Sequence, residues 1–235
     1  MNYQKISYLV VILVVVSSLL ILFKPYFYSL REYGVKYEGE EVMLPEPELK
    51  GEMSVEEAIA KRRSIRYYKD RPLTLKQLSQ LLWAAQGITE EKKKFRAAPS
   101  AGATYPFEIY VVVGYVEGLK PGVYHYDPFN HSLTLIKEGD YRTELQKAAL
   151  NQQWVGKAAV DIVLVAFYER TTKYYGERGY RYVYMEAGHI GQNIYLQAVA
   201  LGLGTVAVGA FHDKEVAKII GTDGDPIYIF PVGVP

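Results

Sequence analysis

A short basic segment has the residue types that could bind a phosphate. Residues 61–66 read Lys-Arg-Arg-Ser-Ile-Arg, so that Arg62, Arg63 and Arg66 surround the hydroxyl of Ser64. Planar guanidinium groups bind phosphate oxygens in pairs, and a serine hydroxyl adds a directed hydrogen-bond donor. An arginine run at a helix end is also often a solvated surface that complements the helix dipole. Taken alone, the segment is only a weak indication of a phosphate site.

A second segment, at residues 98–106, is rich in small side chains and leads directly into an apolar stretch. Small residues let backbone N–H and C=O groups approach a flat ligand closely, and prolines fix the path of the chain. The alternative is a plain loop that enters a strand. The segment reads Ala98-Pro99-Ser100-Ala101-Gly102-Ala103-Thr104-Tyr105-Pro106.

Four polar residues recur at helical spacing in a third segment: Glu186, His189, Asn193 and Gln197. They share one helix face. A Glu/His pair could form half of a metal site, but the other three histidines, at positions 125, 131 and 212, are not at ligand spacing to it, so we predict no metal. Polar groups on a mostly apolar helix more often stabilise a buried network or a subunit interface.

The composition narrows the class of protein. With 235 residues, about half of them apolar, the chain is long enough for one main domain with a full core. The absence of cysteine excludes disulfides, thiolate metal sites and a cysteine nucleophile, so redox chemistry would need a bound cofactor. The 27 basic and 26 acidic residues nearly cancel, and we expect no nucleic-acid partner.

The N-terminal segment predicts a single-pass membrane anchor. Residues 6–23 contain no charge and approach the roughly 20 apolar residues that cross a bilayer. A cleaved signal peptide is the alternative, but its apolar core is usually shorter. The positive charges around the span lean slightly towards a cytoplasmic catalytic domain. We therefore expect an anchor with an interfacial segment at 1–31, a proline-bearing linker at 32–52, and a catalytic domain at 53–235.

Hydrophobic periodicity and cap residues predict an α+β domain in which helices flank a central, mostly antiparallel sheet. We expect helices at 54–63, 74–87, 140–150, 181–201 and 213–220. We expect strands at 107–113, 122–127, 132–136, 160–168, 205–211 and 227–234. The segment 160–168 is almost continuously apolar, as in strands that are buried on both faces.

In order and spacing, these segments resemble the nitroreductase superfamily of FMN enzymes over residues 53–235. The matching pieces are KRRSIR at 61–66, PSAGATYPFEIYVVV at 99–113, EAGHIGQNIYLQAVALGLGTVAVGAF at 186–211, and YIFPVGVP at the end. Within the superfamily the chain is similar to the branch named for streptolysin-associated SagB, the azoline dehydrogenases. The Lys173-Tyr174 pair before the long helix and the GVYHYDP turn at 122–128 carry that likeness.

The resemblance implies a fold, a cofactor and site residues. Arg62 and Ser64 would hold the FMN phosphate, Arg63 would contribute at least its backbone, and Arg66 would lie near the pyrimidine edge of the flavin. A cation there stabilises the negative charge that reduction places on the ring. The segment 99–102 would line the ring edge. The backbone N–H groups of Gly209 and Ala210 would point towards N5, the atom that accepts hydride.

The chain also departs from the family pattern. Many nitroreductases place further basic residues after the last strand to bind the phosphate, whereas this sequence ends at Pro235. Many also have asparagine at the position of Ala103. Weaker flavin binding, or another residue that supplies the charge, is therefore expected.

The branch likeness implies catalytic roles for Lys173 and Tyr174. A lysine whose pKa is lowered by burial can remove a proton from carbon while flavin N5 takes hydride from the neighbouring atom, and a tyrosine can relay or orient. The polar, tyrosine-rich stretch around the pair could instead be a surface loop.

Three functions are open at this point. The first is an FMN-dependent dehydrogenase of the SagB-like branch that acts on a heterocycle. The second is an NAD(P)H-dependent nitro or quinone reductase. The third is a non-catalytic, membrane-bound, flavin-binding accessory protein. A homodimer is expected, because the family builds each flavin site from two subunits.

Overall fold

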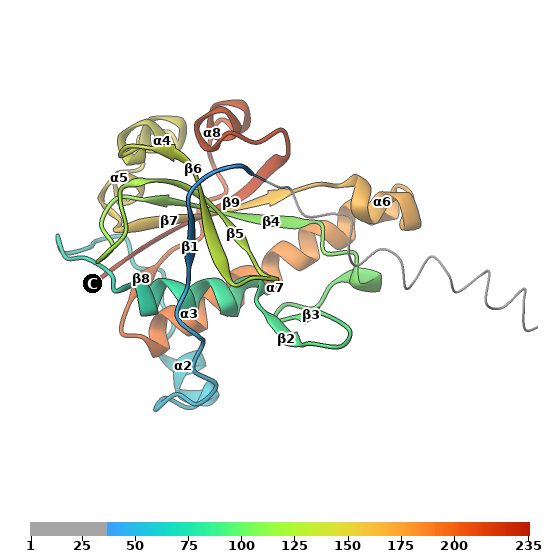
Figure 1. Ribbon diagram of the computed structural model, residues 1–235, viewed down its shortest axis with the longest axis horizontal. Coiled ribbons are helices and arrows are strands. Elements are labelled where there is room, and N and C mark those ends of the chain that lie inside the picture. Colours follow the sequence, from blue (N-terminus) through green and yellow to red (C-terminus); the bar gives the residue numbers. More distant parts are fainter. Residues whose placement is uncertain (1–36) are drawn as a thin grey trace, which may run out of the picture. The chain divides into compact units, whose positions relative to one another are not determined.

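The structure, a computed structural model, describes residues 37–235. A seven-stranded sheet forms the centre of this part of the chain (Figure 1). The strands follow the order β1-β6-β5-β4-β7-β9-β8, and all neighbours are antiparallel. In chain order the strands of this sheet are β1 (Glu41–Met43), β4 (Phe107–Val113), β5 (Gly122–Asp127), β6 (Ser132–Glu138), β7 (Val160–Ala166), β8 (Gly204–Thr205) and β9 (Asp225–Gly233). A separate two-stranded hairpin consists of β2 (Ile88–Glu90) and β3 (Phe95–Arg96). The expected α+β class with an antiparallel sheet is confirmed.

Helices cover both faces of the sheet, as Figure 1 shows. The helices are α2 (Val55–Lys61), α3 (Leu75–Gln86), α4 (Arg142–Ala148), α5 (Gln153–Lys157), α6 (Glu169–Tyr175), α7 (Arg178–Ala200) and α8 (Asp213–Ile220). Side chains of α3 and α7 pack on one face, and those of α4, α5 and α8 pack on the other. Every residue of β4 and β7 is buried, so these strands form the middle of the sandwich.

Local capping sets the best-predicted helix boundaries. The Thr74 hydroxyl accepts a hydrogen bond from the Gln77 backbone N–H, the Gln77 side chain accepts one from the Thr74 N–H, and Gly87 ends α3. Ser54 caps α2 in the same way at the Glu57 N–H. Here the Glu57 side chain does not complete a capping box but pairs with Lys61 at 2.5 Å. The predicted helices at 54–63 and 74–87 are therefore confirmed to within a few residues.

Two predicted elements differ from the structure. The expected strand at 205–211 is limited to β8, after which a single bridge joins Val208 to Ile229. Gly209 and Ala210 therefore leave the sheet and are exposed. Residues 41–43, inside the predicted linker, form β1 and pair with β6.

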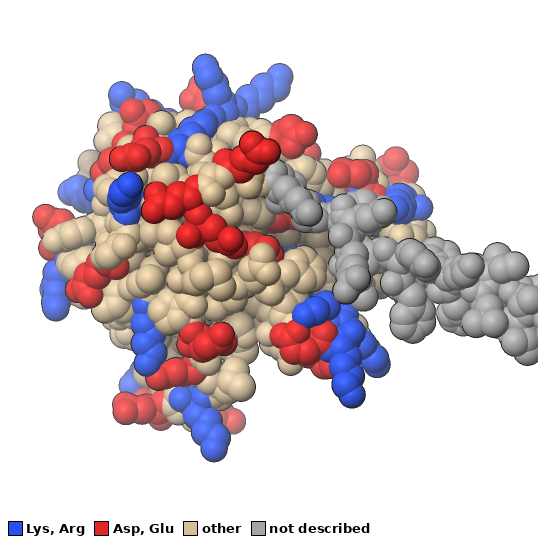
Figure 2. All heavy atoms as spheres, in the orientation of Figure 1, with Lys and Arg blue, Asp and Glu red and all other residues tan. Residues whose placement is uncertain are grey.

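Charged side chains of both signs are interspersed over the face shown in Figure 2. Exposed ion pairs among the described residues include Lys76–Glu48 at 2.5 Å and Lys120–Glu40 at 3.7 Å. Each such pair contributes little to stability. The mixture on this face differs from the one-signed surface with which proteins bind nucleic-acid backbones.

The prediction of a membrane location is corrected. None of the helices in residues 37–235 combines the length and the apolar character that a membrane span requires. The segment 6–23, on which the prediction depends, lies outside the described residues. The single-pass anchor therefore has no support in the structure.

Asp161 is a buried carboxyl near the start of β7 and gives a testable pH dependence of stability. It is fully buried, and neither of its oxygens has a hydrogen-bond partner within residues 37–235. Burial raises the pKa of Asp161 well above its ordinary value, although the Arg142 charge acts in the opposite direction. The folded state thus favours the neutral acid. This contribution to stability is complete below the unfolded-state pKa and is lost as the pH rises towards the folded-state pKa.

We expect Asp161→Asn to stabilise the protein at neutral pH by about 1–3 kcal/mol, because the amide cannot ionise in the buried site. The difference from wild type should shrink as the pH falls and become small below about pH 3, where Asp161 is neutral in both the folded and the unfolded state. Urea unfolding at several pH values measures it, and Asp223→Asn, at an exposed position, serves as the control. A difference that does not change with pH would refute this explanation.

Candidate functional site

The segment 62–66 runs alongside β8, where backbone pairing fixes it. Ser64 forms a parallel bridge with Thr205, and the Ile65 N–H donates to the Thr205 carbonyl at 2.9 Å. The Ser64 hydroxyl forms a 2.9 Å hydrogen bond with the Tyr195 hydroxyl. The Arg62 guanidinium carbon lies 5.3 Å from the centre of the same tyrosine ring. Arg62 and Ser64 therefore meet at one tyrosine of α7.

Arg66 and Arg63 are placed differently. The Arg66 guanidinium carbon lies 5.6 Å from the ring centre of Trp154 in α5. Arg63 folds back and donates to the carbonyls of Ala60 at 3.1 Å and Arg62 at 2.7 Å. The structure thus separates the side chain of Arg63 from Ser64.

Tyr195 is a site residue that the sequence did not reveal. Its hydroxyl accepts a hydrogen bond from the Ala207 N–H at 2.8 Å, besides its bond to Ser64. It thereby joins the basic segment to the chain that follows β8. The neighbouring Thr205 hydroxyl is buried without a partner in the described part of the chain. In the sequence, Tyr195 is one aromatic residue on an amphipathic helix, which is more often a core position.

The three arginines of this segment are available to an anion. Within residues 37–235, no carboxylate forms an ion pair with Arg62, Arg63 or Arg66. Guanidinium groups that have no internal acid can bind phosphate oxygens in pairs. Gly209 and Ala210 lie in the same region, since Gln152, two residues before Trp154, donates its side-chain N–H to the Ala210 carbonyl at 2.8 Å.

The loop 99–105 forms a second group, held in a tight turn. Gly102, Ala103 and Tyr105 have φ values of 59°, 53° and 43°. A Cβ atom at Gly102 would lie 2.6 Å from the Tyr175 hydroxyl, so a side chain there would displace the end of Tyr175, and the positive φ favours glycine. The Thr104 hydroxyl bonds to that of Thr171 at 2.8 Å. The loop therefore packs directly on α6.

Lys173 and Tyr174 are on this same helix. The alternative of a surface loop for the stretch around the pair is wrong, because both residues lie in α6. Both side chains are exposed, and the Lys173 ammonium lies 5.2 Å from the Tyr174 ring centre. α6 brings Lys173 and Tyr174 close to the loop 99–105.

The two groups are separated along α7. The loop meets α7 at Glu186, whereas the basic segment meets it at Tyr195. These residues are nine positions apart, or about 13 Å along the helix axis. The described chain thus gathers the predicted residues into two clusters, with 62–66 and 209–210 in one and 99–102 and 173–174 in the other.

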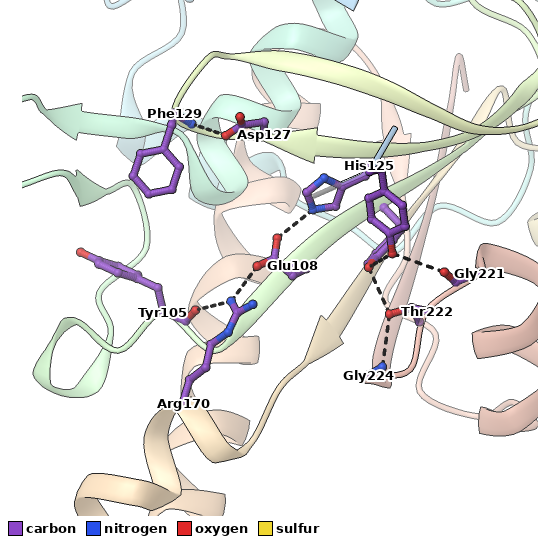
Figure 3. Close-up of polar contacts among 11 residues, drawn as sticks. Tyr105, Glu108, His125, Asp127, Phe129, Arg170, Gly221, Thr222 and Gly224 are labelled. Carbon is purple, nitrogen blue, oxygen red and sulfur yellow. Dashed lines mark hydrogen bonds and ion pairs between the residues drawn. The ribbon is translucent and has the colours of Figure 1, made fainter. Parts of the chain in front are cut away.

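A buried ion pair connects α6 to the sheet (Figure 3). Arg170 lies 2.6 Å from one oxygen of Glu108, and His125 lies 2.8 Å from the other oxygen. Arg170 also donates to the Tyr105 carbonyl at 3.2 Å. In the sequence, Arg170 is one of several charged residues near Lys173, a pattern typical of a solvated surface, but its side chain is only 5% exposed. Burial alone would raise the pKa of Glu108, but the His125 hydrogen bond and the Arg170 charge together lower it.

The comparisons with known proteins agree with this geometry. The family model described as "Nitroreductase family" matches residues 59–234. The chain belongs to the nitroreductase family. The resemblance inferred from the sequence is therefore confirmed.

Among the relatives of this nitroreductase-family chain is MJ1384 of Methanocaldococcus jannaschii, whose name assigns it to the nitroreductases only provisionally. It is 49% identical over 82% of this chain and 96% of its own length. The microcin B17-processing protein McbC of Escherichia coli is 27% identical over 68% of this chain, and the match spans 60% of McbC. A processing protein among the relatives is consistent with the SagB-like branch.

Solved structures give the same fold. A protein of Ralstonia eutropha, provisionally named a nitroreductase, superposes with a TM-score of 0.71 at 32% identity and covers 83% of this chain and 89% of its own. The NADPH:FMN oxidoreductase of Vibrio harveyi superposes with a TM-score of 0.56 at 21% identity, covering 77% of this chain and 68% of its own. At that identity the likeness concerns the fold alone.

Proposed function

We propose that this nitroreductase-family protein is an FMN-dependent oxidoreductase of the SagB-like dehydrogenase type. It would transfer hydride between an oxidisable heterocycle, free or carried on a peptide, and flavin N5. The observation that carries the proposal is that Arg62 and Ser64 meet at Tyr195, in a segment whose arginines have no acidic partner within residues 37–235, beside the exposed residues Gly209 and Ala210. McbC, a processing protein of a peptide microcin, supports the substrate class.

The residues present fit the FMN phosphate. Arg62, Ser64 and Tyr195 would hold it, because a phosphate needs several donors and this cluster has a guanidinium and two hydroxyls in contact. The orphaned Thr205 hydroxyl is buried next to Ser64 and is a further candidate donor. These groups could replace the basic residues that many family members place after the last strand.

The flavin ring would lie beyond the phosphate. FMN, when bound, supplies a two-electron acceptor at N5. Arg66 would stabilise negative charge at the pyrimidine edge, and the backbone N–H groups of Gly209 and Ala210 would orient N5. Pro99, Ser100, Ala101 and Gly102 would line a ring edge.

Lys173 and Tyr174 would perform the proton transfer. Oxidation of a ring C–C unit to a C=C bond removes a hydride from one carbon and a proton from the neighbouring carbon. Lys173 would accept that proton, and Tyr174, against whose ring the Lys173 ammonium lies, would orient it. Their place on α6, next to the loop 99–105, supports this assignment.

One observation favours a second function, an NAD(P)H-dependent nitro or quinone reductase. MJ1384, which is 49% identical, carries a nitroreductase name. The two functions differ in the direction of electron flow. We expect a thiazoline-bearing peptide, and not NADH or NADPH, to reduce the bound flavin of the full-length protein in anaerobic stopped-flow measurements. Fast reduction by NADPH with no reaction of the peptide would favour the reductase.

We expect the protein to be a homodimer, because one chain keeps the two clusters about 13 Å apart along α7 and a second copy could bring them together. The exposed side of α7 carries Tyr184, Met185, Gly188 and Gln192, which suit a close helix interface. Isologous pairing is the commonest symmetry. Light scattering at micromolar concentration tests this expectation. A monomer that binds FMN tightly would contradict it.

A further inference from the structure

The loop 99–105 stores conformational strain that its neighbours must balance. Ala103 and Tyr105 are not glycines, yet both have positive φ values. Such residues occur mostly at functional sites and persist only where surrounding contacts hold them. The contacts that hold this loop therefore decide its conformation.

Three of the side-chain contacts that hold the loop come from α6 and α7, and we call them clamps. Two come from α6, namely the Thr171–Thr104 hydroxyl pair at 2.8 Å and the bond from Arg170 to the Tyr105 carbonyl at 3.2 Å. The third comes from α7. The Ser100 hydroxyl accepts the Tyr105 N–H at 2.9 Å, and a hydrogen bond with the same hydroxyl lowers the pKa of the Glu186 carboxyl. An ionised carboxylate can only accept, so Ser100 is the donor to Glu186.

The clamp at Glu186 contains a buried carboxyl that has few positive charges near it. Glu186 is 2% exposed. Gln86 of α3 donates to it over a long 3.4 Å, and the Arg96 charge from β3 and the phenol of Tyr105 also act on it. The Gln86 side-chain oxygen and the Arg96 Nε are buried and unpartnered within residues 37–235.

We propose that Glu186 is a positioning residue of the flavin site, whose carboxylate holds the Ser100 hydroxyl and thereby keeps the loop 99–105 in its strained conformation. The part that concerns flavin rests on the proposed function. The clamp itself depends only on contacts within the chain. It adds a role for this helix residue that is separate from metal binding and from the subunit interface.

The clamp depends on pH. Burial raises the pKa of Glu186 to about 7, while Ser100, Arg96 and Gln86 act in the opposite direction. An ionised carboxylate accepts a stronger hydrogen bond than a neutral acid does. The clamp therefore tightens as the pH rises through about 7. For global stability the sign is opposite, because the raised pKa favours the neutral acid, whose contribution is lost as the pH rises towards 7.

Hydrogen exchange of the full-length protein tests the clamp without any flavin. The Tyr105 amide donates to Ser100, so its protection factor, already corrected for intrinsic exchange, reports on the clamp directly. We expect this protection to rise about fivefold between pH 6 and pH 8, the difference between a neutral and a charge-assisted hydrogen bond. In Glu186→Gln it should be independent of pH, and in Ser100→Ala it should be lost. Glu177→Gln, an exposed glutamate before α7, should behave as wild type.

Riboflavin binding tests the link to the flavin site, because riboflavin has no phosphate that titrates in this range. We expect its affinity for wild type to rise several-fold over the same pH interval, and to stay constant in Glu186→Gln. Equal pH dependence of Tyr105 protection in Glu186→Gln and wild type would overturn the clamp. If protection of the Tyr105 amide depends on pH but riboflavin affinity does not, the role of Glu186 at the flavin site would be overturned. A protein that binds no flavin but keeps the pH-dependent protection would refute the proposed function alone.

Discussion

Arg62→Ala is expected to weaken FMN binding by about 10- to 10²-fold, the value of one charge-assisted hydrogen bond to a phosphate. Arg62 lies over Tyr195 beside Ser64, and no carboxylate in residues 37–235 competes for it. Adding Ser64→Ala should weaken binding further, by less than the sum of both effects if the two share one phosphate. Titration of the apoprotein with FMN, followed by flavin fluorescence, gives these affinities.

Two control variants make this result specific. Arg71→Ala removes an exposed arginine just outside the segment and should leave FMN affinity unchanged. Arg62→Lys keeps the charge but loses the planar fork, so it should bind FMN with intermediate affinity. Riboflavin affinity should change little in Arg62→Ala, because it lacks the phosphate. An equal loss for FMN and riboflavin would mean that Arg62 supports the fold rather than the phosphate.

Lys173→Ala is expected to slow substrate oxidation by about 10²-fold or more, which is the usual contribution of a positioned acid or base. FMN affinity should not change, because Lys173 is on α6 and the basic segment contacts α7. The measurement is the rate of flavin reduction by a thiazoline-bearing peptide under single-turnover conditions across pH 6 to 10, the range in which a lysine base would titrate.

Lys173→Arg distinguishes a base from a charge. Arginine keeps the positive charge but does not release its proton in this range, so it should be as slow as alanine if Lys173 is the base. Tyr174→Phe should have a smaller effect, as expected for an orienting group. Recovery of the rate in Lys173→Arg would assign an electrostatic role. Unchanged rates in Lys173→Ala would mean that Lys173 and Tyr174 have only a structural role on the exposed surface of α6.

The sequence predicted best those features whose causes are local. The limits of α3 depend on Thr74, Gln77 and Gly87, which lie within the helix ends themselves. The buried strand β7 was recognisable because all of its residues except Asp161 are apolar. The structure brings 62–66 and 209–210 into one region, and the roles that the family motifs imply for them towards flavin are still predictions.

The features that were missed depend on contacts between distant residues. Arg170 resembled its solvated neighbours, because its partner Glu108 is on a different strand and leaves no periodic signal near it. α6 has no strong apolar periodicity, and it is held by contacts of its Thr171 and Arg170 with Thr104 and Tyr105, which are distant in the sequence. Tyr195 could not be recognised as a site residue from the sequence, because its contact with the Ala207 N–H, at 2.8 Å, depends on the path of the chain after β8.

Flavin binding by the purified full-length protein tests the central claim most directly. The account predicts a yellow protein whose released cofactor is FMN, bound without a covalent link and stoichiometric with the chain. If the protein is isolated as the apo form, added FMN should restore the same flavin spectrum, and riboflavin should bind more weakly because Arg62 and Ser64 would have no phosphate to hold. A colourless protein that also fails to bind added FMN would contradict the account.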